Sequence, residues 1–385
     1  MIFRSFQIKD FLEMLNLNIP LFYTAHTSCG NGGVPELFPF TLYLDACTGL
    51  PRQEGSNELN DILKAVYGTG VMMTGSMDPH DLVGMSHAAD CLAFTLRCVG
   101  TPAKMRILEI GCGRGHILAE LSRQGGKCVG LEPGDQILAA GGDGIELVRD
   151  FFPSRYLAER KFDLITSFNV IEHIEGLEDF LSSVSECLFE DGNFVFCVPN
   201  CGPYLASGDI SIFLHEHFNY FSSENIISML AKYGLAAVTV EVSKNQALLL
   251  VHARKGRIQA LEQIYSKFDV GRFTISMRSI QHSLMERMAA YDDSEIAIYC
   301  PNRSLNHMSQ IGRKYVRIID DTPALQGLYF PYFLRPVEDF GGLIKNPPCA
   351  IFIFSFTHAE YLRKRCQTHP ALENTEVFAI SDFYR

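Results

Sequence analysis

The pattern of hydrophobic and polar positions divides the chain into three stretches. Residues 1 to about 100 are irregular and rich in Gly, Pro and turn residues, and they end in a predicted helix over 80–98. Residues 104 to about 254 alternate short apolar runs with helical periodicity, and a smaller block of the same kind follows a helical stretch over 256–292. The pattern predicts an N-terminal lobe (1–79), a central domain (80–255) and a smaller α/β domain (256–385).

The central block predicts seven strands with helices between them. The strands are expected over 106–110, 127–132, 145–149, 162–168, 193–198, 236–242 and 247–253, and the main helices over 177–188 and 223–233. Short apolar strands joined by helices form mostly parallel sheets that are covered on both faces. We therefore expect an α/β fold with a seven-stranded, mostly parallel, Rossmann-like sheet, in which ligands bind beyond the carboxyl ends of the strands.

Composition narrows the class of protein. The 385 residues are 47% hydrophobic and 20% charged, which is typical of a folded chain, and the net charge of −11 argues against a nucleic-acid partner. No apolar run reaches the length of about 18 residues that a membrane span needs. The N-terminus is a poor signal peptide because acidic residues interrupt its apolar stretch, and the 12 cysteines are scattered. The sequence predicts a cytoplasmic protein with no membrane or nucleic-acid partner.

A glycine-rich turn joins the first strand of the central block to its first helix. The turn reads Glu109-Ile-Gly111-Cys-Gly113-Arg-Gly115-His116. Glycines at this point let the backbone approach a ligand closely and leave amides available at the start of the helix. A dinucleotide fingerprint needs a small residue where His116 stands, and no Gly-Lys-Ser/Thr phosphate loop is present. The turn therefore predicts another kind of nucleotide ligand.

Polar residues end each of the first four strands of the block. After Glu109, Glu132 ends the second strand, where a carboxylate could accept both hydroxyls of a ribose. Asp150 ends the third strand and could accept an adenine amino group, with Phe151 or Phe152 beside the ring, and Asn169 follows the fourth. Because these strands are expected to be parallel, the four side chains should lie at one edge of the sheet.

This arrangement resembles the class I S-adenosylmethionine-dependent methyltransferases, which have an acidic residue, Gly-x-Gly-x-Gly and a second acid at the next strand end. The resemblance implies that S-adenosylmethionine is the cofactor and S-adenosylhomocysteine its product. It places Gly111 and Gly113 against the methionine part of the cofactor and Glu132 on its ribose. The remaining residues expected to contact the cofactor are Glu109, Pro133, Asp150, Phe151 and Asn169.

Two histidine-bearing segments are candidates for catalysis. His173 directly follows the fourth strand, and His215, Glu216 and His217 lie between the fifth strand and the next helix. A histidine with an ionisable neighbour can act as a general base with an orienting partner. The second segment lacks the His-Glu-x-x-His spacing of zinc proteases, so we expect no metal there. The alternative is a loop whose neutral imidazoles are hydrogen-bonded to the backbone.

A narrower resemblance is carried by Val129-Gly-Leu-Glu-Pro133, Asn169-Val-Ile-Glu-His173 and His215-Glu-His-Phe-Asn-Tyr-Phe-Ser222. These segments are similar to the nucleotide-sugar C-methyltransferases of deoxysugar pathways. That family implies a zinc-binding N-terminal domain, a methyltransferase core and a Rossmann-like C-terminal domain. It also implies that His217 removes a proton next to a ketone and that the resulting enolate takes the methyl group. Glu216 would orient or bind the substrate, His173 would be a second active-site histidine, and His215 and Tyr220 would contact the substrate.

The sequence departs from the family pattern at several positions. Leu214 stands where the family has a tyrosine, and Val71-Met-Met-Thr-Gly75 replaces a tyrosine-bearing segment. The family binds zinc through paired cysteines, whereas here only His26, Cys29 and Cys47 remain as candidate ligands. Three ligands do not complete a tetrahedral structural site, so we expect a metal-free lobe. Two alternatives stay open: an O- or N-methyltransferase of another small metabolite, and a relative that binds the cofactor without catalysis.

Overall fold

The computed structural model describes residues 14–23, 37–46, 48–68, 82–135, 137, 144–256, 268–355 and 358–384. The candidate zinc ligands His26, Cys29 and Cys47, and the segment 71–75, lie outside the described residues. The strands are β1 (Leu15–Pro20), β2 (Leu37–Leu44), β3 (Pro51–Gln53), β4 (Arg106–Ile110), β5 (Lys127–Leu131), β6 (Ile145–Val148), β7 (Phe162–Phe168), β8 (Leu188–Pro199), β9 (Leu235–Val242), β10 (Leu248–Lys255), β11 (Ile296–Tyr299), β12 (Arg317–Ile319), β13 (Val337–Glu338), β14 (Ala350–Ile353) and β15 (Glu376–Ala379). The α-helices are α1 (Asn57–Gly68), α2 (Leu82–Val99), α3 (His116–Arg123), α4 (Leu177–Cys187), α5 (Gly202–Ser207), α6 (Ser223–Lys232), α7 (Val270–Met288), α8 (Leu305–Ile311), α9 (Phe340–Lys345) and α10 (Ala359–Thr368).

The chain forms two compact units, each assembled from separate stretches of sequence. One unit contains Met1–Leu42, Pro203–His215 and Asp269–Arg385, and the other contains Tyr43–Gly202 and Glu216–Phe268. The predicted domain boundaries at 79/80 and 255/256 follow changes of pattern along the chain, whereas the units join stretches that are distant in sequence. The division into three domains stays a prediction.

A seven-stranded sheet forms the centre of the second unit, in the order β6-β5-β4-β7-β8-β10-β9. The pairs among β6, β5, β4, β7 and β8 are parallel, and β10 pairs antiparallel with both β8 and β9. The predicted seven-stranded, mostly parallel sheet is confirmed. Since β6, β5, β4 and β7 are parallel neighbours, the residues that follow them lie along one edge of the sheet.

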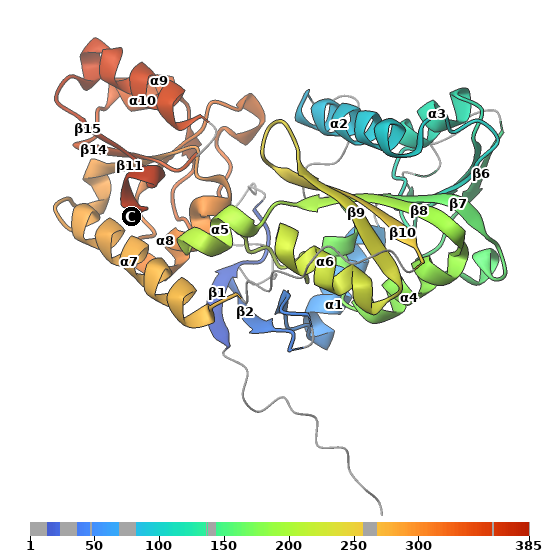
Figure 1. Cartoon of the computed structure of the whole chain (residues 1–385). Helices are drawn as coiled ribbons and strands as arrows, with labels where there is room; N and C mark the ends of the chain where they lie inside the picture. Colours follow the sequence, from blue (N-terminus) through green and yellow to red (C-terminus); the bar gives the residue numbers. More distant parts are fainter. Residues whose placement is uncertain are drawn as a thin grey trace, which may run out of the picture. The chain divides into compact units, whose positions relative to one another are not determined.

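Helices cover both faces of this sheet (Figure 1). Successive residues of β7 and β8 point to opposite faces, as the pleat of a strand requires. Leu164 and Val195 belong to the buried cluster on the face that α2 and α3 cover, whereas Ile165 and Phe196 belong to the cluster on the face covered by α4 and α6. All four side chains are fully buried, which explains why these strands read as continuous apolar runs in the sequence.

The other unit contains a five-stranded parallel sheet in the order β13-β12-β11-β14-β15. Ile298 and Phe352 pack in the cluster that includes α7 and α8, and Ala297 and Ile351 pack in the cluster that includes α9 and α10. This sheet lies in the region for which the sequence predicts a second, smaller α/β domain.

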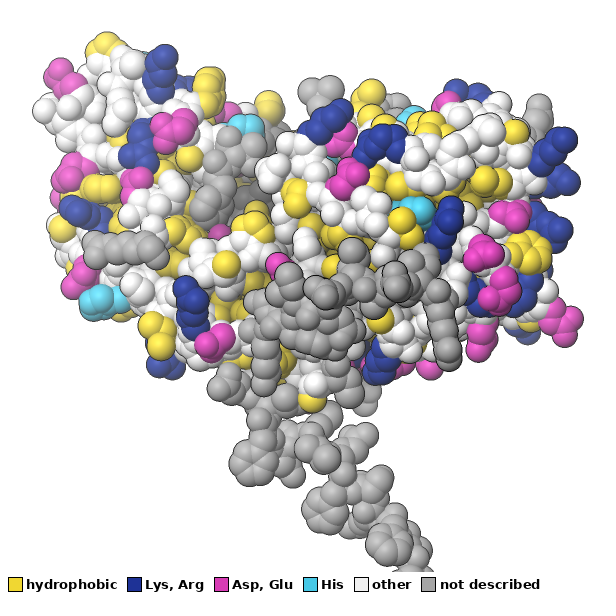
Figure 2. Space-filling view, viewed as in Figure 1, with side chains coloured by type: hydrophobic (Ala, Val, Ile, Leu, Met, Phe, Trp, Pro, Cys, Tyr) yellow, Lys and Arg dark blue, Asp and Glu magenta, His cyan; other side chains and the backbone are white. Residues whose placement is uncertain are grey.

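Basic and acidic side chains of the described residues are interspersed on the face shown in Figure 2. Ion pairs within the second unit include Arg97 with Glu241 at 2.7 Å and Arg160 with Glu146 at 2.6 Å. Nucleic-acid binding needs a stripe of one sign, and this face does not present one among the described residues. Within the described part of the chain, no helix has the length and apolar character needed to cross a membrane.

A buried histidine in β10 should make the fold sensitive to acid. His252 is 3% exposed and donates through Nε2 to Asn193 Oδ1 at 2.9 Å. Burial, with a smaller effect of the Arg254 charge, lowers the pKa of His252 to about 4. Because the unfolded chain takes up this proton near pH 6.5, stability falls as the pH drops from about 6.5 towards 4. We expect His252 to account for a loss of about 1–2 kcal/mol between pH 7 and pH 5.

Urea unfolding of wild type and His252→Gln across this pH range measures the effect. Glutamine can still donate to Asn193 but has no titrating group, so the variant should lose less stability on acidification. His282→Gln, at an imidazole that is 72% exposed on α7, should leave the wild-type pH dependence unchanged. An equal pH dependence in His252→Gln and wild type would show that His252 does not contribute.

Candidate active site

The glycine-rich turn between β4 and α3 has the backbone conformation that its glycines predict. Gly111 has φ 71° and Gly113 has φ 53°, both in the left-handed region that side chains rarely adopt. A Cβ atom on Gly111 would lie 2.3 Å from Val170 Cγ2, so no larger residue fits there. A Cβ on Gly113 would meet open space. The turn therefore lies against Val170 on one side and leaves room for a ligand at Gly113.

Glu132 connects this turn to the end of β5. Its Oε2 accepts a hydrogen bond from the Gly113 amide at 3.1 Å, and its Oε1 accepts one from the Gly134 amide at 2.9 Å. Burial raises the pKa of Glu132, and the two amides act in the opposite direction. Each carboxylate oxygen has a second lone pair, so Glu132 can still accept hydroxyl groups of a ribose. Pro133, which follows it, accepts at its carbonyl from Arg149 Nε at 3.4 Å.

Glu109 places a second carboxyl group beside the turn. It is 4% exposed, and its Oε2 has no hydrogen-bond partner among the described residues. Burial raises the pKa of Glu109 to about 8, and the nearby charge of Glu132 raises it further, although the Leu118 amide lowers it. A positive charge would favour the ionised form of both acids. The carboxyl groups of Glu109 and Glu132 therefore fit a ligand that combines hydroxyl groups with a positive charge, as S-adenosylmethionine does.

The other predicted cofactor residues lie at the same edge of the sheet. Asp150 follows β6, and its two carboxylate oxygens accept from the Phe151 amide at 2.9 Å and from Ser154 Oγ at 2.8 Å. The ring of Phe151 is 59% exposed, which leaves its faces available for stacking. Asn169 follows β7 with φ 54°, and its amide donates to the Cys197 carbonyl at 3.1 Å. The structure thus brings the four strand-end groups together along β6, β5, β4 and β7.

The two histidine-bearing segments are held together by backbone hydrogen bonds. His173 ends the 3-10 helix η3 (Ile171–His173) just after β7. The Glu172 carbonyl accepts from the amides of Phe218 at 2.7 Å and Asn219 at 3.1 Å. Asn219 in turn donates through Nδ2 to the carbonyls of Ile171 at 2.9 Å and Ile174 at 2.7 Å. The loop that carries Glu216 and His217 is therefore fixed against the end of β7.

These contacts bring the rings of His173 and His217 together, with centroids 4.8 Å apart and planes at 80°. His173 donates through Nδ1 to the Glu216 carbonyl at 2.8 Å, which leaves Nε2 as the acceptor of the neutral ring. Burial lowers the pKa of His173 to about 4, although this hydrogen bond raises it. Glu216 is 4% exposed, and the buried ring of Tyr220 lies 6.5 Å from that of His217. The structure thus groups His173, Glu216, His217 and Tyr220.

His215 has a different environment. Its ring lies edge-on to Phe38 at 5.5 Å and to Phe40 at 5.7 Å, all within the first unit. Burial lowers the pKa of His215 to about 4, and backbone groups of Ile19 and Phe38 act in the opposite direction. These contacts identify His215 as a packed core imidazole, and its role as a substrate contact stays a prediction.

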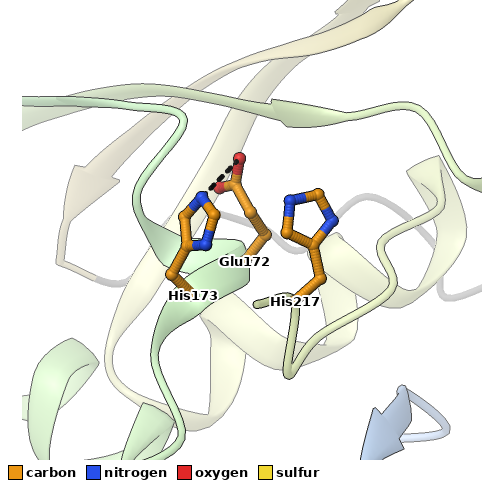
Figure 3. Close-up of side chains that lie close together, drawn as sticks. All are labelled: Glu172, His173 and His217. Atoms are coloured by element: carbon orange, nitrogen blue, oxygen red, sulfur yellow. Dashed lines mark ion pairs between the residues drawn. The ribbon is translucent and has the colours of Figure 1, made fainter. Parts of the chain in front are cut away.

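Sequence reasoning missed Glu172. This residue is 1% exposed, and its Oε1 lies 3.8 Å from His173 Nε2 (Figure 3). The pKa of Glu172 is raised to about 8, mainly by burial and in smaller part by the charge of Glu216, while a backbone hydrogen bond acts in the opposite direction. The signal was present, since Glu172 directly precedes His173 after a buried strand, but nothing in the local pattern says that the carboxyl group points into the site.

Comparison with known proteins agrees with this geometry. A family model described as a methyltransferase domain matches residues 85–240. The chain is 28% identical to the C-methyltransferase NovU of Streptomyces niveus over 148 residues, which are 36% of this chain and 34% of that protein. It is 30% identical to a ubiquinone biosynthesis O-methyltransferase of Nitrosococcus oceani over 109 residues, 26% of this chain and 46% of that protein. The chain thus spans between a third and a half of the length of these relatives.

Among solved structures, the chain is similar to the 1,6-didemethyltoxoflavin-N1-methyltransferase of Burkholderia thailandensis. The identity is 15%, the TM-score is 0.40, and the similarity covers 57% of this chain and 96% of that one. Residues 85–240 therefore match a methyltransferase domain, in agreement with the prediction from the glycine-rich turn and the acidic strand ends.

Proposed function

We propose that this chain transfers the methyl group of S-adenosylmethionine to a carbon atom of a keto-sugar nucleotide. The observation that carries the proposal is the close pair formed by His173 and His217. His173 lies just after β7, at the edge of the sheet where the proposed cofactor residues also lie. Proton removal from carbon needs such a base, whereas many other methyl acceptors react without one. A relative at 28% identity, NovU, is named as a C-methyltransferase, which supports carbon as the acceptor atom.

In the proposed mechanism, His217 removes the proton from the carbon next to the substrate ketone. The electrons of that C–H bond form an enolate, and the proton stays on the imidazole until it passes to solvent. When bound, S-adenosylmethionine would supply an electrophilic methyl group on a positively charged sulfur, and transfer of this group to the enolate carbon would leave S-adenosylhomocysteine. Glu216 orients His217 or binds the substrate, while His173 and Tyr220 enclose the reacting carbon.

Solvent deuterium exchange tests the order of these events. In D₂O with S-adenosylhomocysteine in place of the methyl donor, the proposal predicts that the enzyme exchanges one substrate C–H position, seen as a mass increase of one unit. With S-adenosylmethionine, the same carbon should carry the new methyl group. Methyl transfer without any exchange at that carbon would contradict the enolate mechanism.

O-methylation is the second candidate function. Leu214 replaces the tyrosine of the sugar C-methyltransferases, which removes a phenol from the expected active site. Relatives named as ubiquinone biosynthesis O-methyltransferases also match this chain, with 30% identity over 109 residues in the N. oceani protein. An oxygen acceptor loses a proton that exchanges freely with solvent, so this candidate predicts a methylated product with no deuterium on carbon.

A further inference from the structure

Glu172, His173 and His217 form a cluster that the proposed mechanism uses only in part. One potential ligand atom from each side chain lies within 4.8 Å of the other two. The side chains come from two segments, η3 and the loop before α6, and they converge as Figure 3 shows. Glu172 is 1% exposed, His217 is 2% exposed and the side chain of His173 is 19% exposed, so two of the three residues are buried and the third reaches solvent in part.

The orientation of His173 is the first sign of a ligand site. Because its Nδ1 donates to the Glu216 carbonyl, the lone pair of the neutral ring is on Nε2, and this atom lies 3.8 Å from Glu172 Oε1. An ionised carboxylate and an imidazole lone pair repel each other at this distance unless a proton or a cation lies between them. A metal-binding histidine usually donates one ring N–H to a carbonyl or carboxylate and binds the metal ion through the other nitrogen, and His173 is oriented in this way.

The carboxyl group of Glu172 is the second, independent sign. Its Oε2 is buried and has no hydrogen-bond partner among the described residues. A buried carboxyl oxygen without a partner costs free energy of about 1–3 kcal/mol, and more when it is charged. The backbone contacts of Glu172 with Phe218 and Asn219 hold the residue in place, so the side chain cannot avoid this environment by moving to solvent.

We propose that Glu172, His173 and His217 bind one divalent transition-metal ion of the Zn²⁺ class. Two imidazoles and one carboxylate favour zinc, cobalt or nickel over the oxygen-liganded magnesium and calcium. Bond lengths of about 2.0–2.2 Å place tetrahedral ligand atoms about 3.3–3.6 Å apart, so the three ligand atoms need to approach one another by at most about 1.5 Å. Three protein ligands leave one tetrahedral position open.

The ion would also change the chemistry of the site. A His217 nitrogen that ligates a cation cannot accept the substrate proton, so the metal-loaded protein should lose the proposed methyl transfer. This consequence rests on the proposed function, whereas the binding site itself does not. At the active site, the sequence prediction of no metal considered only the 215–217 segment, whereas two of the three ligands come from η3, more than 40 residues earlier in the chain.

Metal titration of the chelator-stripped full chain tests the site without any substrate. With CoCl₂ as the probe, we expect saturation at one ion per chain and visible absorption bands of a four-coordinate cobalt ion, which ZnCl₂ removes by competition. Glu172→Gln keeps the size of the side chain but weakens the ligand, and it should lower the affinity at least tenfold. Glu190→Gln, at a carboxylate that is 81% exposed, is the matched control and should bind like wild type.

Absence of saturable cobalt binding, or equal affinity in Glu172→Gln and wild type, would overturn the proposal. If Glu172→Gln fails to fold by circular dichroism, His217→Asn replaces it with the same expected loss of affinity. Methyl transfer is then compared between stripped and zinc-loaded wild type. Equal rates, with the metal bound, would leave the site standing and contradict His217 as the base, so the two failures are distinguishable.

Discussion

His217→Asn should lower kcat for methyl transfer by at least about 100-fold, because a positioned general base contributes about 10²–10⁴-fold to a rate. Asparagine occupies a similar volume and can form hydrogen bonds, but it cannot hold the substrate proton. Steady-state kinetics with a keto-sugar nucleotide and S-adenosylmethionine measures the loss.

Cofactor affinity separates a chemical effect from a folding defect in this experiment. Calorimetry with S-adenosylhomocysteine should give the same dissociation constant for His217→Asn and wild type within a factor of about two, because His217 is not among the cofactor residues. His282→Asn, at an exposed imidazole on α7, should change neither kcat nor the affinity. If kcat of His217→Asn stays within twofold of wild type, His217 is not the base.

The second large effect is expected at Glu132. In Glu132→Gln one carboxylate oxygen becomes an amide nitrogen, so a donor faces either the Gly113 amide or the Gly134 amide, which are donors themselves. The substitution also removes an acceptor for the ribose hydroxyls. Hydrogen bonds to a charged group contribute about 1.5–3 kcal/mol each, so the dissociation constant of S-adenosylhomocysteine should rise about 10- to 100-fold.

Calorimetry measures the dissociation constant of S-adenosylhomocysteine for wild type, Glu132→Gln and the control variant Glu190→Gln. The control variant carries the same chemical change at an exposed carboxylate and should retain wild-type affinity. Glu132 is buried, so the melting temperature of the variant is recorded as well, and binding is measured well below it. Unchanged affinity in a folded Glu132→Gln variant would mean that Glu132 supports the turn without touching the cofactor.

The sheet was predictable where its strands are buried on both faces. The predicted strands over 106–110 and 162–168 coincide with β4 and β7, because continuous apolar runs bounded by glycine or polar residues mark such strands. The strand predicted over 193–198 was too short. β8 begins at Leu188, and Glu190, Asp191 and Gly192 lie within it, so charged residues hide a strand that pairs with β7 through an irregular register.

The site was predictable only as far as strand ends determine it. Glu132, Asp150 and Asn169 follow neighbouring strands, so the sequence alone placed them at one edge of the sheet. The environments of Glu172 and His215 depend on residues that are distant in the chain. Phe218 and Asn219 hold Glu172 in place although they are more than 40 positions away in the chain. Phe38, which packs on His215, is more than 170 positions away from it. Local patterns cannot encode contacts of that kind.

The central claim is that the edge formed by β6, β5, β4 and β7 holds S-adenosylmethionine. Isothermal titration of the wild-type chain with S-adenosylhomocysteine tests it most directly, because the measurement needs no knowledge of the methyl acceptor. One molecule bound per chain, with a dissociation constant in the micromolar range, is the predicted result. No detectable binding at millimolar ligand by a folded protein would contradict the account.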